Sequence, residues 1–174
     1  QVMQRQSKAL AIGMVVQQAA PLIQADPNVL KSVNMDRTFK NLVDLCEKSC
    51  DKYKERELFG TKTDGSWKWS TYAEFAKLVD DFRGGLAGLG VSAGDKVGIV
   101  ANNRVEWAVA AYATYGLGAA FVPMYEAQKS DEWRFILDDC GAKIVIGSTN
   151  AIYDKLKGIQ DKVSSLKHVV GMEA

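Results

Sequence analysis

Hydrophobic residues at helical spacing define one clear helix in the middle of the chain. Thr71 and Glu74 have the spacing of a capping box, in which each side chain satisfies a backbone donor at the start of a helix. Gly90 is placed to end this helix, because glycine readily adopts the left-handed conformation that follows a helix. The apolar stripe of this predicted amphipathic helix consists of Tyr72, Phe75, Leu78, Val79, Phe82, Leu86 and Leu89.

After this helix, short apolar runs alternate with segments long enough to form helices. Such runs, without internal polar alternation, are typical of strands that are buried on both faces of a sheet. Pro123 is expected to end the second strand, since proline cannot donate a hydrogen bond to a neighbouring strand. The predicted strands are residues 96–101, 119–122, 143–146 and 167–170.

The segments between these strands have their own helix signals. Asn102 or Asn103 is expected to cap the first helix, Ser130 the second, and the third is expected to begin near Asn150. Strands that alternate with helices at this spacing predict an α/β fold with a mostly parallel sheet flanked by helices. Because the last strand lies close to Ala174, we expect further β/α units to follow in a longer protein.

Upstream of this region the pattern predicts a small β-hairpin. The pair Asp64-Gly65 lies between two β-prone runs and is typical of a hairpin turn. Trp67 and Trp69 alternate with Lys68, so both indole rings are expected on one face of the second strand. Core packing accounts for two tryptophans on one face, and no basic groove accompanies them that would suit a nucleic acid.

Residues 1–55 predict an N-terminal helical arm. One helix is expected near residues 4–19, and Thr38 is expected to cap a second helix. The apolar run at residues 9–16 is shorter than the roughly 20 residues that a membrane-spanning helix needs. The sequence leaves open a peripheral membrane association and a homodimer through this arm.

Composition and charge narrow the classes of partner. The chain has 22 basic and 21 acidic residues, a net charge of +1, and its lysines and arginines are scattered. This pattern does not indicate a nucleic-acid partner. Cys46, Cys50, Cys140 and the single His168 lack the spacing of a zinc site, so no metal site is predicted. Free cysteines without disulfide-type spacing favour the cytoplasm or an organelle matrix.

The sequence contains no recognisable catalytic motif. A phosphate-binding GxxxxGK[ST] loop and a GxSxG elbow do not occur. The glycine-rich stretch 84–90 closes a helix and precedes a strand, whereas a dinucleotide-binding loop follows a strand and opens a helix. The acidic pairs Asp80-Asp81 and Asp138-Asp139 are expected on the surface, because consecutive helical positions point in different directions. We therefore predict no catalytic residue.

Four segments resemble the adenylate-forming (AMP-binding) superfamily, and within it the N-terminal part of the long-chain fatty acid–CoA ligases, or acyl-CoA synthetases. They read WSTYAEF at 69–75, KVGIVANNRVEW at 96–107, YGLGAAFVPMY at 115–125 and DDCGAKIV at 138–145. Their order and spacing agree with those of the family. Many members have Pro-Thr where this chain has Glu126-Ala127, which leaves the exact subfamily open.

This resemblance implies that the parent enzyme uses ATP, Mg²⁺ and CoA to convert a fatty acid through an acyl-adenylate into acyl-CoA, AMP and pyrophosphate. It also implies that the phosphate-binding loop, the nucleotide-binding residues and the catalytic lysine lie downstream of Ala174. Residues 56–174 are then the first α/β portion of the AMP-binding large domain, truncated before that loop. Such a fragment is expected to be inactive alone and to need the remainder of its own enzyme as partner.

Three residues are predicted to contact substrate or CoA. Tyr125, Glu126 and Arg134 follow the carboxyl ends of predicted strands, where open α/β sheets bind ligands. Two alternatives to a fatty acid–CoA ligase stay open. One is another adenylate-forming activity, such as aryl-CoA ligation or a luciferase-like oxidation. The other is a non-enzymatic interaction module that acts through residues 1–55.

Overall fold

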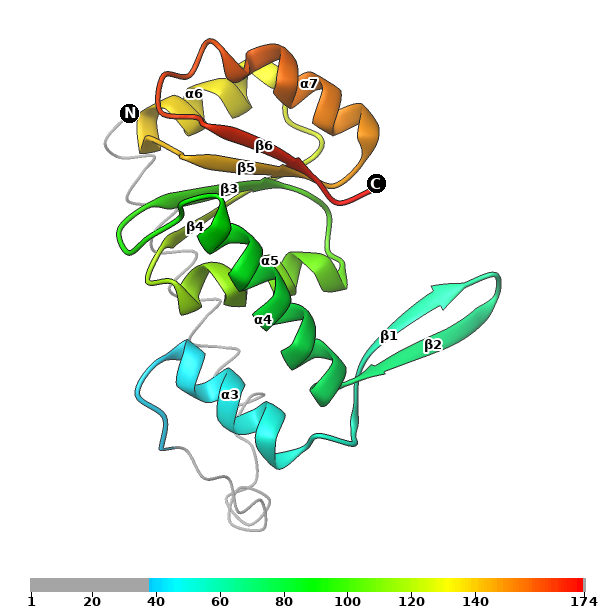
Figure 1. Cartoon of the computed structure of the whole chain (residues 1–174). Helices are drawn as coiled ribbons and strands as arrows, with labels where there is room; N and C mark the ends of the chain where they lie inside the picture. Colours follow the sequence, from blue (N-terminus) through cyan, green and yellow to red (C-terminus); the bar gives the residue numbers. More distant parts are fainter. Residues whose placement is uncertain (1–37, 174) are drawn as a thin grey trace, which may run out of the picture. The chain divides into compact units, whose positions relative to one another are not determined.

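The computed structural model describes residues 38–173, nearly all of which belong to the compact unit Phe39–Ala174. The helix predicted near residues 4–19 lies outside the described residues. None of the described helices has the length and apolar character needed to cross a membrane. In chain order (Figure 1) the elements are α3 (Leu42–Lys52), β1 (Glu57–Thr63), β2 (Ser66–Thr71), α4 (Tyr72–Gly88), β3 (Lys96–Val100), α5 (Val105–Gly116), β4 (Ala120–Met124), α6 (Ser130–Cys140), β5 (Ile144–Gly147), α7 (Asn150–Gln160) and β6 (His168–Gly171).

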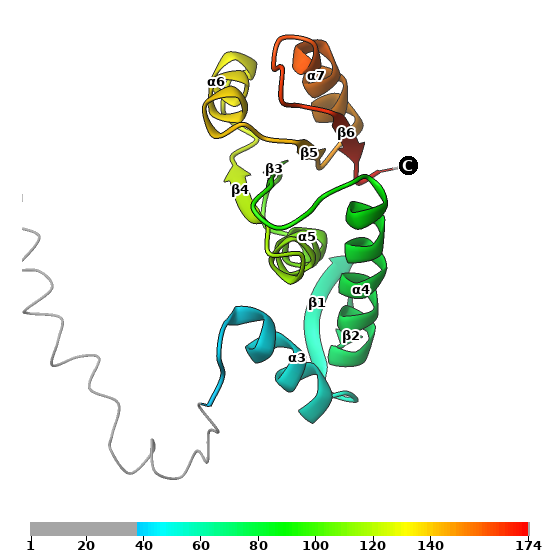
Figure 2. The same ribbon diagram turned by 60° about the vertical axis from the view of Figure 1, so that its left-hand side comes forward.

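A four-stranded parallel sheet forms the centre of the fold, with strand order β4-β3-β5-β6. Alternate residues of β3 face opposite sides of the sheet. Val97 and Ile99 pack in the cluster formed with α4 and α5, whereas Val100 packs in the cluster formed with α6 and α7. Figure 2 shows the sheet between these two helical layers. The predicted α/β fold with a parallel sheet flanked by helices is thus confirmed.

The predicted capping box at the start of α4 is present. The Thr71 hydroxyl accepts a hydrogen bond from the backbone N–H of Glu74 at 3.2 Å, and the Glu74 carboxylate accepts one from the Thr71 N–H at 2.8 Å. After the helix, Gly90 adopts a φ of +84°, which a side chain would disfavour. Both signals therefore bound the helix where the sequence places them.

Three predicted helix caps differ from the structure. Asn41, and not Thr38, caps α3, because its side chain accepts from the Asp44 N–H at 2.9 Å. Arg104 stands at the N-cap of α5 without a side-chain hydrogen bond to the helix. Ser130 is the first residue of α6 rather than its cap. Several polar residues stand side by side at each of these starts, so spacing alone does not select the capping residue.

Pro123 lies inside β4 and does not end it, which corrects the predicted strand boundary. It is paired in register with Ile99 of β3. β4 is an edge strand, and edge strands tolerate proline because one side of their backbone has no neighbour to pair with.

The β1–β2 hairpin turns at Asp64-Gly65 as predicted, but the expectation that its tryptophans pack in the core is wrong. Trp67 is 60 % exposed and Trp69 is 52 % exposed. The hairpin extends away from the four-stranded sheet (Figure 1), and the two indole rings stack on each other with centroids 6.0 Å apart. Trp69 also lies across Gly60, where a Cβ would come within 2.9 Å of its ring.

Asp95 and Lys143 tie two loops together at the amino end of the sheet. The Asp95 carboxylate accepts hydrogen bonds from Lys143 Nζ at 2.9 Å and from the Ser92 N–H at 2.8 Å. The hydrogen bond with Lys143 has the largest effect on the pKa of Asp95. Together these interactions lower that pKa from 3.8 to about 2. Because the folded protein favours the ionised form, the carboxylate stabilises the fold at pH values above its unfolded pKa of 3.8. This stabilisation is lost as the pH falls from 3.8 towards 2.

Replacement of Asp95 with asparagine is therefore expected to lower the melting temperature at pH 7 and to flatten its decline between pH 3.8 and pH 2. Thermal unfolding followed by circular dichroism across this range measures both effects. Asp138→Asn, which alters an exposed carboxylate on α6, is the matched control. Equal acid-range slopes for Asp95→Asn and the unchanged chain would contradict this account.

Candidate functional site

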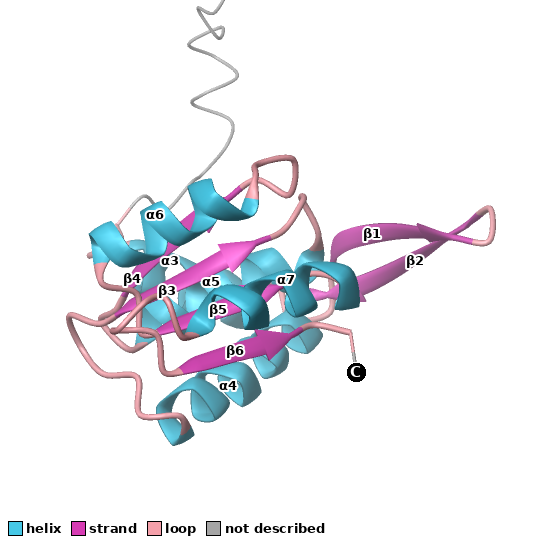
Figure 3. Cartoon of the chain, turned by 90° about the horizontal axis from the view of Figure 1, so that it is seen from above, coloured by secondary structure: helices cyan, strands magenta, loops and turns pink. Residues whose placement is uncertain are grey.

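Polar side chains gather where the four parallel strands end. The loops after β3, β4, β5 and β6 begin near Ala101, Tyr125, Ser148 and Met172. Because the strands are parallel, all of these loops lie at one edge of the sheet (Figure 3). Open α/β sheets bind ligands at this carboxyl edge, so it is the candidate functional site.

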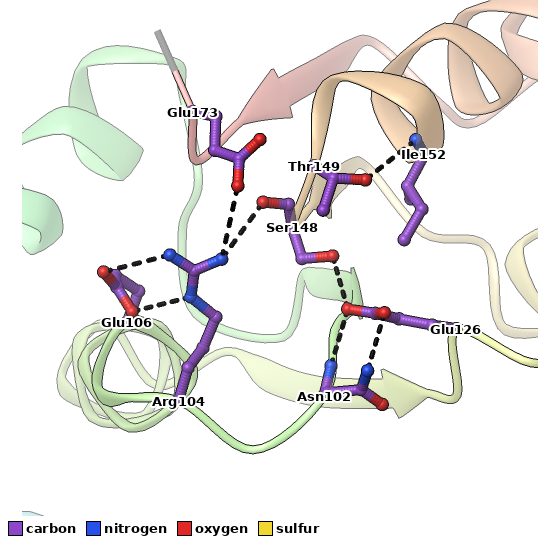
Figure 4. A network of polar contacts seen from close by, with 8 residues as sticks. All are labelled: Asn102, Arg104, Glu106, Glu126, Ser148, Thr149, Ile152 and Glu173. Atoms are coloured by element: carbon purple, nitrogen blue, oxygen red, sulfur yellow. Dashed lines mark hydrogen bonds and ion pairs between the residues drawn. The ribbon is translucent and has the colours of Figure 1, made fainter. Parts of the chain in front are cut away.

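Glu126 connects the loops that follow β3, β4 and β5. Its Oε1 accepts hydrogen bonds from the Asn102 backbone N–H at 2.8 Å and from Ser148 Oγ at 2.6 Å. Its Oε2 accepts one from Asn102 Nδ2 at 2.7 Å. Figure 4 shows the carboxylate between these two residues. Both oxygens of Glu126 are therefore engaged by donors of the chain itself.

Arg104 extends the network to β6. Its Nε and a terminal nitrogen donate to the two carboxylate oxygens of Glu106, at 2.7 and 3.2 Å. The other terminal nitrogen donates to the Ser148 carbonyl at 3.2 Å and lies 3.9 Å from the Glu173 carboxylate (Figure 4). Hydrogen bonding between Arg104 and Glu106 raises the pKa of the arginine and lowers the pKa of the glutamate. Arg104 is thus held as a cation at the edge of the sheet.

Tyr125 presents an exposed ring on a fixed backbone. Its side chain is 76 % exposed. Its N–H donates to Gln128 Oε1 at 2.9 Å, and its carbonyl accepts from Trp133 Nε1 at 3.0 Å. The ring lines a hollow of about 570 Å³ whose walls include Trp107 and the amides Asn102 and Asn103. Two aromatic rings and two amides suit a ligand with flat apolar and hydrogen-bonding parts.

The structure brings together two of the three predicted contact residues. Tyr125 and Glu126 are adjacent in the loop after β4, whereas Arg134 lies on α6, where its Nε is 3.9 Å from the Asp131 carboxylate. The prediction that these residues contact substrate or CoA stays a prediction. Sequence reasoning did not single out Asn102, Arg104 or Ser148 as a site, although each follows the end of a predicted strand.

The described residues do not fit a magnesium site. Mg²⁺ is held by carboxylates, phosphates and water in octahedral geometry. Among residues 38–173 there is no group of three or more His, Cys, Asp or Glu side chains that could hold a metal ion. The acidic residues of the candidate site, Glu106, Glu126 and Glu173, are engaged by Arg104, Asn102 and Ser148. We therefore assign no metal step to this part of the chain.

The class of protein follows from this fold and from a family comparison. The profile of the family described as AMP-binding enzyme matches residues 46–174. The chain belongs to this family.

Curated relatives include ligases that act on long-chain fatty acids. The long-chain-fatty-acid–CoA ligase FadD15 of Mycobacterium bovis is 34 % identical over 107 residues, which cover 62 % of this chain and 18 % of that protein. Long chain acyl-CoA synthetase 8 of Arabidopsis thaliana is 25 % identical over 148 residues, with 74 % of this chain and 20 % of that protein covered. The chain thus spans about a fifth of the length of these relatives.

Solved structures show the same fold. The anthranilate CoA ligase AuaEII, in complex with anthranoyl-AMP, is similar with a TM-score of 0.69 and 25 % identity, over 77 % of this chain and 25 % of that chain. The Mycobacterium tuberculosis fatty acyl CoA synthetase has a TM-score of 0.68 and 24 % identity, over 77 % of this chain and 27 % of that chain. The fold of the described residues is therefore that of the corresponding part of these enzymes.

Proposed function

We propose that this chain is the first α/β portion of the large domain of a long-chain fatty acid–CoA ligase. The observation that carries this proposal is the family match over residues 46–174, together with curated relatives named for long-chain fatty acids. In the parent enzyme, the fatty acid carboxylate attacks the α-phosphate of ATP and releases pyrophosphate, and the thiolate of CoA then displaces AMP from the acyl-adenylate to give acyl-CoA. The substrate class is tested by measuring kcat/KM of the full-length enzyme for a panel of fatty acids of different chain lengths.

A second candidate is an acyl-CoA ligase that acts on aromatic acids. The similarity to the anthranilate CoA ligase, at a TM-score of 0.69, supports it as well as the fatty acyl CoA synthetase supports the first. Anthranilate and benzoate belong in the same panel. A higher kcat/KM for aromatic acids than for any fatty acid would favour this second candidate.

The isolated 174-residue chain is expected to show no ATP–pyrophosphate exchange. Formation of the adenylate requires stabilisation of negative charge at the α-phosphate by a metal ion, lysine and backbone donors. We propose that the rest of the parent enzyme supplies these groups. Exchange of labelled pyrophosphate into ATP, measured beside the full-length enzyme, is the test. Exchange by the isolated chain above the no-protein blank would contradict the prediction.

Tyr125 and Arg134 are our proposed contacts to CoA or substrate in the parent enzyme. Arg134→Ala is expected to raise the KM for CoA by roughly 3- to 10-fold, because a charge-assisted contact to a phosphate is lost. Lys77→Ala removes a cation from α4, on the opposite face of the sheet, and is the matched control. An unchanged KM in Arg134→Ala would remove this residue from the site.

The alternative of an interaction module acting through residues 1–55 makes a separate prediction. In that case the chain forms a stable oligomer, such as a homodimer, that light scattering detects. Removal of residues 1–37 would then abolish the oligomer, while the compact unit from Phe39 onward keeps its fold. A monomer at all concentrations would remove the reason for this alternative.

A further inference from the structure

We propose that Glu126 is a positioning residue whose carboxylate fills, from within the chain, the place where a sheet of this topology would receive an anionic ligand. Three features of the described residues support this role of Glu126: the strand order, the donors around its carboxylate and the complete burial of one donor, Ser148.

The strand order predicts a ligand-binding crevice between the carboxyl ends of β3 and β5. β3 is the first strand of the sheet in sequence, and its two neighbours are β4 on one side and β5 on the other. The chain connections therefore change direction at this point, and ligands of doubly wound sheets bind beyond the carboxyl ends of the two strands that flank it. Asn102 follows β3 and Ser148 follows β5, and both donate to Glu126.

The donors around Glu126 have the character of an anion site. A backbone N–H, a side-chain amide and a hydroxyl converge on the carboxylate at 2.8, 2.7 and 2.6 Å. Such short hydrogen bonds to an ionised acceptor are stronger than those between neutral groups. The three donors come from loops far apart in sequence, at 24 and 22 residues from Glu126. One side chain therefore fixes the relative positions of three strand ends.

Ser148 adds an independent reason why the carboxylate is required. Its side chain is completely buried, at 0 % exposure, so water does not satisfy its hydroxyl. Its Oγ donates to Glu126 Oε1. A buried hydroxyl without an acceptor is destabilising, because it has lost its hydrogen bonds to water. Removal of the carboxylate therefore leaves a set of oriented donors that an external carboxylate of similar size can satisfy.

Chemical rescue tests the proposal on the 174-residue chain. Glu126→Ala is expected to lower the melting temperature by roughly 5–15 °C, because three hydrogen bonds to a charged acceptor are lost. Sodium formate is then expected to restore about 3–6 °C once it exceeds its Kd by tenfold, since it binds only the folded variant. Sodium chloride at equal ionic strength controls for general salt effects.

Two further variants keep the test decisive. Glu126→Gln fills the same space with an amide, so it is expected to be destabilised and to gain no more from formate than from chloride. Glu132→Ala removes an exposed carboxylate on α6 that accepts a single N–H, from Lys129 at 2.9 Å, and is also expected to show no formate effect.

If Glu126→Ala does not fold without salt, refolding yield in formate against chloride replaces the melting temperature as the measure. The proposal is overturned if Glu126→Ala has the same melting temperature as the unchanged chain. It is also overturned if formate raises the melting temperature of Glu126→Ala no more than it raises that of Glu126→Gln.

Discussion

Replacement of Leu137 with alanine is expected to lower the free energy of unfolding by about 2–5 kcal/mol. Leu137 lies on α6, is completely buried, and packs against the centre of the sheet. Its Cδ2 lies within 2.7 Å of the point that a Cβ on Gly98 of β3 would occupy. Loss of the side chain therefore opens a cavity between the helix and the middle strand. Urea unfolding of the 174-residue chain measures the change.

Gly98 provides a second variant that tests the same contact. Gly98→Ala alone is expected to cost about 1–3 kcal/mol, because the added methyl group overlaps Leu137 Cδ2. In Gly98→Ala/Leu137→Ala the new methyl group occupies part of the space that Leu137 leaves. The double variant should therefore lose less free energy of unfolding than the sum of the losses of the two single variants. Leu78→Ala, at an exposed position of α4, serves as control. Simple additivity would show that the two residues do not share this space.

The sequence allows the layered part of the fold to be predicted because local and long-range signals agree there. The capping box of Thr71 and Glu74 is a short-range signal, and the left-handed Gly90 ends the same helix. In β3 and β5 the continuous apolar runs reflect burial on both faces, which only a parallel sheet covered by two helical layers provides. Helix caps depend on residues that are close in sequence, and buried strands depend on the pattern of apolar residues. Both can be read directly from the amino-acid sequence.

The hairpin shows where the same reasoning fails. Period-2 alternation placed Trp67 and Trp69 on one face correctly, but it does not say whether another element covers that face. In the described residues the two rings stack on each other, and Trp69 lies against Gly60. Burial is a property of the tertiary arrangement, so the assumption that large aromatic residues lie in a core was wrong here.

The candidate site was predictable in position but not in composition. The rule that ligands bind beyond strand ends led to Tyr125 and Glu126, which both lie at the carboxyl edge. The partners Asn102 and Ser148 were missed because their pairing depends on β3 lying between β4 and β5. Strand order is not encoded in the spacing of hydrophobic residues. Small polar residues are common in loops, so sequence alone does not distinguish these two from their neighbours.

The polar network and the hollow beside it divide the carboxyl edge into two parts. Glu126 accepts hydrogen bonds from Asn102 and Ser148, and Arg104 donates one to the Ser148 carbonyl. These groups between β3 and β5 are therefore already hydrogen-bonded within the chain and offer a ligand few free donors or acceptors. Tyr125 and Trp107 line the hollow next to β4, and the Tyr125 side chain is exposed there. A ligand that reaches this edge is therefore expected to contact Tyr125, whose backbone is held by hydrogen bonds to Gln128 and Trp133.

Trp133 on α6 is expected to be at least as sensitive to truncation as Leu137. It is only 1 % exposed, and its indole N–H donates to the Tyr125 carbonyl at 3.0 Å. Trp133→Ala should cost about 3–5 kcal/mol, since a large buried ring is removed. The same carbonyl also accepts from the Gln128 N–H at 3.2 Å, so it keeps one donor in the variant. Urea unfolding of the isolated chain gives this value.

Trp133→Phe separates packing from the hydrogen bond. Phenylalanine keeps an aromatic ring in the core but cannot donate a hydrogen bond to Tyr125. The free energy of unfolding is therefore expected to fall by part of the packing loss of Trp133→Ala plus about 0.5–1.5 kcal/mol for the hydrogen bond. If the indole N–H also positions the loop, Trp133→Phe should raise the KM for CoA in the full-length enzyme by less than Tyr125→Ala does, and should leave the acid-range stability governed by Asp95 unchanged. A Trp133→Phe variant as unstable as Trp133→Ala would contradict this expectation, because both variants lack the hydrogen bond to Tyr125 and differ only in the retained phenyl ring.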